Sequence, residues 1–190
     1  ADVTSQASMD AAAARAIAEF GKLDIAVANA GVYSAAGGDS RLSYNEADWD
    51  VTFAVNVKGL AHTADAVTPH MKERRSGRII IIASHGGRAP RGVKVRPGTV
   101  GMPYSTSKAA AIQFTHALAI ELAQHNINVN CVCPGTLWTP MWEKIAANVE
   151  RHDPSKAGRA PRQVFESQVN ANTPLGRPQT PEDIGRAVAF

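Results

Sequence analysis

The 190-residue chain has only two cysteines, Cys131 and Cys133, which are separated by a single residue. Two cysteines this close on one strand do not suit a normal disulfide, and no histidine cluster accompanies them to complete a metal site. We therefore expect no metal, and we interpret both thiols as core groups of a protein that works in the reducing, cytoplasmic compartment.

Strong charge and long apolar segments are also missing. The 20 Lys and Arg residues exceed the 17 Asp and Glu residues by only three and are scattered, so nucleic acid is not an expected partner. No stretch resembles a signal peptide or a membrane span, so we expect a soluble protein without a membrane partner. With 44% hydrophobic residues, the chain is long enough to bury one core over residues 1–190.

What is present is an alternation of strand and helix patterns. We expect helices near 9–20, 45–75, 104–124, 143–149 and 161–171, strands near 23–28, 78–84 and 127–132, and a last helix from 181. A capping box from Ser43 to Glu46 is expected to open the long helix, and Asn56 with Gly59 predicts a kink or local opening inside it.

The β-branched run at 78–82 is typical of a strand that is covered on both faces, as in a parallel sheet. Together with the alternation of strands and helices, it predicts an α/β protein. The expected architecture is a Rossmann-like doubly wound parallel sheet with helices on both faces.

The segment 104–108 carries the most informative chemistry, because Tyr104 and Lys108 are four residues apart. Pro103 suits the first turn of a helix, which would place both side chains on one helix face. A phenol ionises near pH ~10, and an ammonium about 4 Å away at a dielectric near 20 favours the phenolate by roughly 4 kcal/mol. Tyr104 would then serve as a general acid/base near neutrality. By itself, the spacing also fits a solvated helix face.

Further motifs follow one another along the chain in a fixed order. They are Asp2-Val3, Asn29-Ala30-Gly31, Asn56, Ser84, Tyr104 with Lys108, Pro134-Gly135-Thr136 with Thr139, and Pro181-Glu182-Asp183. In this order they resemble the motifs of the short-chain dehydrogenase/reductase family, and the resemblance covers essentially the whole chain. Any one of them alone would be weak.

The resemblance implies hydride transfer between a nicotinamide cofactor, NAD or NADP, and a secondary alcohol or ketone. Ser84 would hydrogen-bond the substrate carbonyl, and Tyr104 would transfer the proton. Lys108 would lower the pKa of Tyr104 and bond the nicotinamide ribose, while Asn56 would hold a water that links Lys108 to solvent. The implied cofactor contacts are Tyr104, Lys108, Asp2, Val3, Asn29, Ala30, Gly31, Pro134, Gly135, Thr136 and Thr139.

Taken singly, three of these residues have simpler interpretations. Ser84 also fits a polar residue at a strand end, Asn56 a helix kink without chemistry, and Asp2 a cap of the first helical region. The joint pattern favours the catalytic interpretation.

The irregular segment 136–180 is expected to be a substrate lid. Trp138 and Trp142, with Met141 between them, would line a pocket that closes over the ligand. The alternative is that they fasten the lid to the core. The basic segment 88–96, with Arg88, Arg91, Lys94 and Arg96, would select an anionic substrate, contact another subunit or be a solvated loop.

One element of the family pattern is missing, namely the glycine-rich pyrophosphate turn Thr-Gly-x-x-x-Gly-x-Gly. Gly37-Gly38 lies in the wrong context to replace it. We expect an interior piece of a larger domain, incomplete at both ends and lacking on the order of 60 residues upstream. The residue that selects NAD or NADP would lie in that part.

The alternative to an enzyme is a truncated, non-catalytic fragment that acts as a binding or oligomerisation module. The helices expected over 45–75 and 104–124 resemble the pair that family members pack across a two-fold axis. A homodimer or homotetramer is therefore expected.

Overall fold

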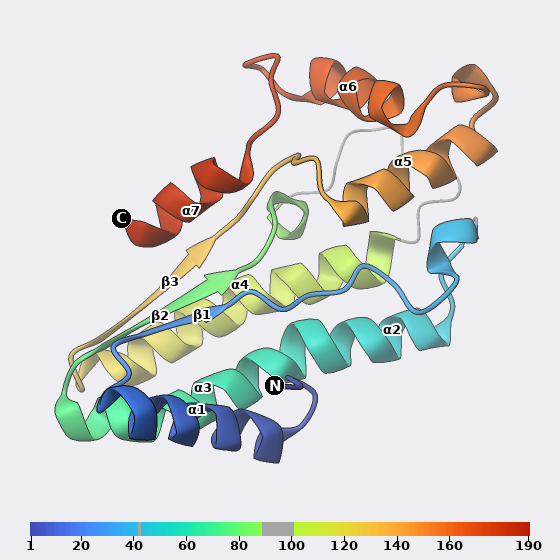
Figure 1. Ribbon diagram of the computed structural model, residues 1–190. Helices are drawn as coiled ribbons and strands as arrows, with labels where there is room; N and C mark the ends of the chain where they lie inside the picture. Colours follow the sequence, from blue (N-terminus) through green and yellow to red (C-terminus); the bar gives the residue numbers. More distant parts are fainter. Residues whose placement is uncertain (42, 89–100) are drawn as a thin grey trace.

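The structure, a computed structural model, describes residues 1–41, 43–88 and 101–190 (Figure 1). Its elements are α1 (Gln6–Phe20), β1 (Ile25–Ala28), α2 (Glu46–Phe53), α3 (Gly59–Arg74), β2 (Gly77–Ile82), α4 (Gly101–Ala123), β3 (Ile127–Val132), α5 (Pro140–His152), α6 (Pro161–Asn172) and α7 (Pro181–Ala189). Each expected helix and strand is present, with ends that differ by a few residues. Within the described ranges, no helix is both long and apolar enough to cross a membrane.

The three strands form a parallel sheet in the order β1-β2-β3. Parallel neighbours need crossover connections, and here these are α2 with α3 between the first two strands and α4 between the last two. Figure 1 shows α3 and α4 on one face of the sheet and α7 on the other, with α1 outside α3. This arrangement confirms the predicted α/β class with a Rossmann-like parallel sheet.

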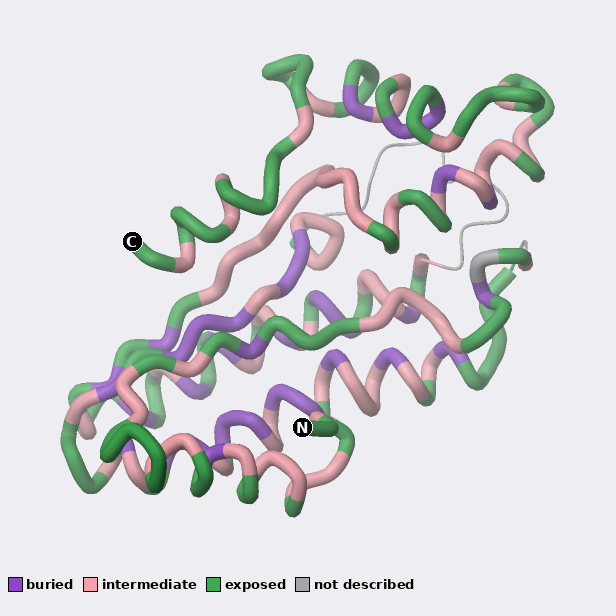
Figure 2. Tube along the Cα trace, in the orientation of Figure 1, coloured by how far each residue is buried: buried purple, intermediate pink, exposed green. Residues whose placement is uncertain are grey.

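The middle strand β2 is buried on both faces, as its β-branched run predicts. Ile79, Ile80 and Ile81 are 1%, 6% and 1% exposed, although successive side chains of a strand point to opposite faces. Ile79 and Ile81 share one face and belong to the same core cluster as Met71 of α3 and Leu122 of α4, which are fully buried. Figure 2 shows these buried segments facing one another across the interior.

The long helix expected over 45–75 is divided in two by a π-helical segment, Ala54–Lys58. A π-turn adds one residue to the helical turn, and it occurs often at functional sites. Asn56 lies inside this segment and is 1% exposed. The predicted local opening near Asn56 and Gly59 is therefore confirmed.

The predicted capping box from Ser43 to Glu46 is wrong by two residues. The N-cap is Asn45, whose side chain accepts a hydrogen bond from the Asp48 amide, while the Asp48 carboxylate accepts one from the Asn45 amide. The physical reason is tertiary, because the same carboxylate also receives two hydrogen bonds from the guanidinium of Arg41.

We expect Leu122→Ala to lower the free energy of unfolding by about 2–5 kcal/mol, because the removed side chain lies fully inside the core between α4 and the sheet. Equilibrium unfolding in urea measures the loss. Leu175→Ala is the matched control, since Leu175 is 77% exposed, and it should change stability by no more than about 0.5 kcal/mol. Equal losses in the two variants would contradict this assignment of the core.

Candidate active site

The carboxyl ends of the three strands meet at one edge of the sheet. The pairing continues past the ends of β2 and β3, since the Ala83 amide donates to Val132 O and the His85 amide donates to Pro134 O, both at 2.9 Å. Ligands of open α/β sheets bind outside such carboxyl ends. The segment after β2, with Ser84, and the segment after β3, with Pro134, are therefore side by side where a ligand is expected.

Ser84 is the N-cap of a short turn, His85–Gly87, and its Oγ accepts a hydrogen bond from the Gly86 amide at 3.2 Å. The turn packs directly on the backbone of α4. A Cβ atom on Gly87 would lie 2.5 Å from the carbonyl carbon of Lys108 and 2.6 Å from the amide of Ala109. Only glycine permits this approach, which holds Ser84 beside α4. No local sequence pattern marks Gly87 as a residue of the site.

Lys108 is buried, and its Nζ donates to the carbonyl oxygen of Ile82 at 2.8 Å. Burial lowers the pKa of Lys108 to about 8, so the amine is mostly charged at neutral pH. Its Nζ lies 5.8 Å from the centre of the Tyr104 ring. The helix thus brings this pair together as predicted. The effect of Lys108 on the pKa of Tyr104 stays a prediction.

The amide of Asn56 links the loop after β1 to α4. Its Oδ1 accepts from the Val32 amide at 2.8 Å, and its Nδ2 donates to Val32 O and to Ser107 Oγ, each at 2.9 Å. The Ser107 hydroxyl in turn donates to the carbonyl oxygen of Tyr104 at 2.7 Å. Asn56 keeps one lone pair for a further donor. Its implied water-holding role stays a prediction.

Gly31 lies close to the side chains of both Asn56 and Lys108. A Cβ atom there would lie 3.4 Å from both Asn56 Oδ1 and Lys108 Nζ. The backbone after β1 therefore passes directly over the buried lysine, which places the Asn29–Gly31 motif at the same site.

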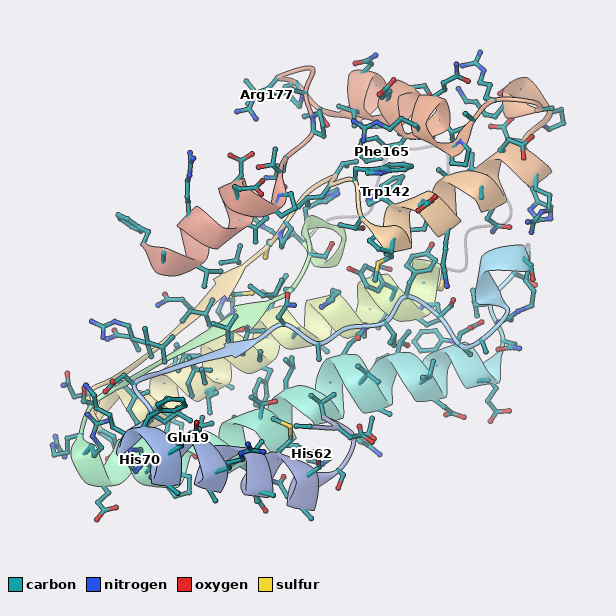
Figure 3. The ribbon with its side chains drawn as sticks, viewed as in Figure 1. Glu19, His62, His70, Trp142, Phe165 and Arg177 are labelled. Atoms are coloured by element: carbon teal, nitrogen blue, oxygen red, sulfur yellow. The ribbon has the colours of Figure 1, made fainter. Side chains whose placement is uncertain are left out.

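Three of the expected cofactor residues, Val3, Asn29 and Ala30, line one small cavity of about 90 Å³. Val3 is positioned by α3, where His62 Nδ1 donates to its carbonyl oxygen at 2.8 Å (Figure 3). Gly59 leaves room for its side chain, since a Cβ atom there would approach Val3 Cγ2 to 2.9 Å. No motif or spacing in the sequence predicts this contact of His62 with Val3.

Asp2 directly precedes Val3, which lines this cavity, but its carboxylate is already hydrogen-bonded to Thr4. Its exposed carboxylate accepts hydrogen bonds from the amide of Thr4 at 2.9 Å and from its hydroxyl at 2.8 Å. These bonds lower the pKa of Asp2, the backbone one most. The structure thus gives Asp2 a local turn contact with Thr4, whereas the N-cap of α1 is Ser5. Contact of Asp2 with a cofactor stays a prediction.

The motif after β3 is held by a residue that the sequence analysis missed. The Gly135 amide donates to Gln179 Oε1, and the Gln179 amide donates to Thr136 O at 3.1 Å. Thr139 is the N-cap of α5, since its Oγ1 accepts from the Trp142 amide at 3.3 Å. The Pro134–Thr139 segment therefore joins the sheet to the expected lid.

The aromatic residues of the lid pack on one another. Trp138 and Trp142 meet Phe165 of α6 edge to face, with ring centres 5.1 and 5.4 Å apart, and Figure 3 shows Trp142 and Phe165 next to each other between α5 and α6. These contacts join the two lid helices to each other, so they do not decide whether the tryptophans fasten the lid to the core. Contact of either tryptophan with a substrate stays a prediction.

A larger cavity of about 310 Å³ lies between the loop after β1 and α5. Its walls include Tyr33 from the loop and Met141 from α5. The Tyr33 ring packs on the Tyr104 ring with centres 5.3 Å apart, so this cavity adjoins the candidate acid/base. Tyr33 lies two residues after the Asn29-Ala30-Gly31 motif, and this position in the sequence could have indicated that it belongs to the site.

The predicted basic segment is described only at Arg88, which is exposed. Arg91, Lys94 and Arg96 lie outside the described residues.

Comparisons with known proteins identify a family and a fold that this chain resembles. The family model for short chain dehydrogenases matches residues 1–150. The chain is 40% identical over 190 residues to the BbsD subunit of (2S)-[(R)-hydroxy(phenyl)methyl]succinyl-CoA dehydrogenase from Thauera aromatica, and 37% identical to oxidoreductase UcpA from Salmonella typhimurium, covering 100% of this chain in both cases. It spans 66% of the length of each of these relatives.

A solved structure of NAD+-bound xylitol dehydrogenase has the same fold. Its TM-score is 0.82 at 29% identity, and the match covers 100% of this chain and 69% of that one.

We expect Gly87→Ala to lower the free energy of unfolding by about 1–3 kcal/mol, because the added methyl group forces the turn after Ser84 away from the backbone of α4. Gly86→Ala is the matched control, since a Cβ atom there meets only Ser84 Oγ at 3.5 Å. Thermal and urea unfolding of both variants test this. A Gly87→Ala protein as stable as Gly86→Ala would show that the turn does not rest on α4.

The lowered pKa of Lys108 makes the free energy of unfolding depend on pH. Between pH 8 and the ordinary pKa of 10.5, unfolded Lys108 holds a proton that folded Lys108 has released, so its contribution to stability rises with pH. Relative to Lys108→Met, the wild type should therefore gain up to about 3 kcal/mol across this window. Urea unfolding of both proteins at several pH values measures it. A difference that is constant with pH would contradict the lowered pKa.

Proposed function

Because this chain belongs to the short chain dehydrogenase family, we propose that it forms the catalytic part of an oxidoreductase that interconverts a secondary alcohol and a ketone. The observation that carries the proposal is the convergence of three groups. The turn of Ser84 packs on α4 at Lys108, and Lys108 Nζ lies under the Tyr104 ring.

In the proposed reaction, the Ser84 hydroxyl donates a hydrogen bond to the substrate oxygen and orients it toward Tyr104. During reduction, the Tyr104 phenol gives its proton to that oxygen, and during oxidation the phenolate removes the proton from the alcohol. The charge on Lys108, fixed by the bond to Ile82 O, stabilises the phenolate. Asn56 holds the loop and α4 together so that this geometry is preserved.

The residues at the sheet edge fit a dinucleotide cofactor, NAD or NADP. The small cavity by Val3, Asn29 and Ala30 and the unsubstituted backbone at Gly31 form a cradle beside Lys108. In the proposal, these residues hold the cofactor together with Asp2, Tyr104, Lys108 and the segment Pro134, Gly135, Thr136 and Thr139. When bound, the cofactor supplies or accepts the hydride. The solved neighbour bound to NAD+ supports this choice of ligand.

We place the substrate in the 310 Å³ cavity beside Tyr104. The lid segment 136–180 would close it, with Met141 facing the ligand. Trp138 and Trp142 support the lid through Phe165 and would approach the ligand from its edge.

A homodimer or homotetramer in the cytoplasm completes the proposal. Helices α3 and α4 lie in the segments that resemble the helix pair packed by family members across a two-fold axis, which supports this assembly. Both cysteines are free thiols, which supports a reducing compartment.

Tyr104→Phe in the full-length protein should lower kcat by about 10²–10⁴-fold, because the variant has no proton to transfer. Cofactor affinity should stay close to that of the wild type, since the ring and Lys108 remain. Initial rates with NADH and NADPH and a fluorescence titration of both cofactors measure the two effects.

Tyr44→Phe is the matched control for that experiment. The Tyr44 hydroxyl donates to the sulfur of Met102 at 3.6 Å and has no part in the proposed reaction, so the variant should turn over at the wild-type rate. Near-normal turnover by Tyr104→Phe would refute the acid/base assignment. Failure of the folded wild type to bind either cofactor would favour a non-catalytic role.

A further inference from the structure

The larger cavity contains a polar atom that the proposed reaction does not use. Asn148 of α5 lines the cavity and is 8% exposed. Its Oδ1 is buried and has no hydrogen-bond partner in the described part of the chain. A buried acceptor without a donor costs free energy, so such an atom is a candidate contact for a ligand.

The orientation of this amide follows from its other hydrogen bond. Asn148 Nδ2 donates to the carbonyl oxygen of Arg41 at 3.1 Å. A backbone carbonyl can only accept, so the nitrogen of the amide has to face Arg41. The oxygen is then the end that lacks a partner, and exchanging the two atoms would break the observed bond.

The carbonyl of Arg41 is itself held in place. The Arg41 guanidinium binds the fully buried carboxylate of Asp48 through two hydrogen bonds of 2.9 and 3.0 Å. The same carboxylate accepts from the amide of Ala35, a residue of the cavity wall, at 2.8 Å. Burial opposes ionisation of Asp48, but these hydrogen bonds outweigh it and lower its pKa. The wall facing Asn148 is therefore preorganised around a charged group.

Apart from Tyr33, Ser34, Lys144 and Asn148, the side chains that line the cavity are apolar. Its walls include Val32, Ala35, Ala36, Met141, Ile145 and Val149. Tyr33 also lines the cavity, and its ring packs on that of Tyr104. A ligand that places its reacting carbon at Tyr104 would thus lay an apolar body along these walls.

Resting on the proposed function, we propose that Asn148 determines substrate specificity. Its Oδ1 accepts a hydrogen bond from a hydroxyl or N–H group that the substrate carries away from the reacting carbon. A site built to bind such a donor discriminates against an analogue that lacks it, because the analogue leaves the buried acceptor unpaired. The substrate class is a secondary alcohol or ketone with an apolar body and a second, hydrogen-bond-donating group.

The test compares matched alcohols with the full-length protein and its cofactor. The pairs are cyclohexanol with 1,4-cyclohexanediol and 2-pentanol with 1,4-pentanediol, so that only the second hydroxyl differs. In at least one pair, the wild type should prefer the diol by about tenfold in kcat/KM. Asn148→Leu and Asn148→Ala should both abolish this preference.

Asn172→Leu is the control, because Asn172 is exposed on α6, and it should keep the preference of the wild type. A general loss of structure lowers kcat/KM for both members of a pair, whereas loss of the contact changes their ratio. If Asn148→Leu does not fold, Asn148→Ala provides the same ratio. No preference in the wild type, or an unchanged preference in the Asn148 variants, would overturn the inference and assign Oδ1 to solvent.

Failure of the proposed function is distinguishable from failure of this inference. If no alcohol is turned over, calorimetry on the wild type and the Asn148 variants measures binding of the same pairs. Tighter binding of the diol that depends on Asn148 would support the contact even without catalysis. Equal binding of both alcohols, or no binding, would overturn it.

Discussion

The site depends on the burial of one lysine between the sheet and α4. The bond from Lys108 Nζ to Ile82 O joins the end of β2 to the helix that carries Tyr104. Because an ammonium is costly to bury, its surroundings have to keep a hydrogen-bond acceptor within reach while excluding side chains. Gly87 meets this requirement, since it passes too close to the backbone of Lys108 for a side chain to be added without rearrangement, and the backbone at Gly31 lies against Lys108 Nζ. Lys108, Tyr104 and the turn of Ser84 are therefore held together by α4.

Two buried polar side chains extend this arrangement to the loop after β1. Asn56 fixes Val32 through two backbone hydrogen bonds, and Asp48 fixes Ala35. Both come from the helical segment that is interrupted by the π-turn, which directs Asn56 inward. Networks of this kind are stable only when nearly every member is paired. The unpaired oxygen of Asn148 at the edge of the same wall is an exception that a ligand would explain.

Much of this arrangement is predictable from local patterns. The isoleucine run of β2 and the Tyr104–Lys108 spacing determine a covered strand and a shared helix face, because both depend on periodicity within a few residues. The prediction placed the capping box two residues too early. The observed box uses Asp48, whose carboxylate is also held by two hydrogen bonds from Arg41, and a local pattern does not contain that contact. The lid tryptophans were placed in the correct segment, yet their contact with Phe165 joins residues more than twenty positions apart.

The sequence by itself determined the α/β class, the order of the elements and the identity of the chemical groups, because strand and helix periodicities and motif order are local properties of the chain. Only the tertiary structure decided which groups support the site. Packing between distant segments places Gly87 against the backbone of α4 and His62 against Val3. It also brings Asn148 and Tyr33 into the lining of one cavity. No spacing in the sequence encodes those contacts, since each depends on how the layers meet in space.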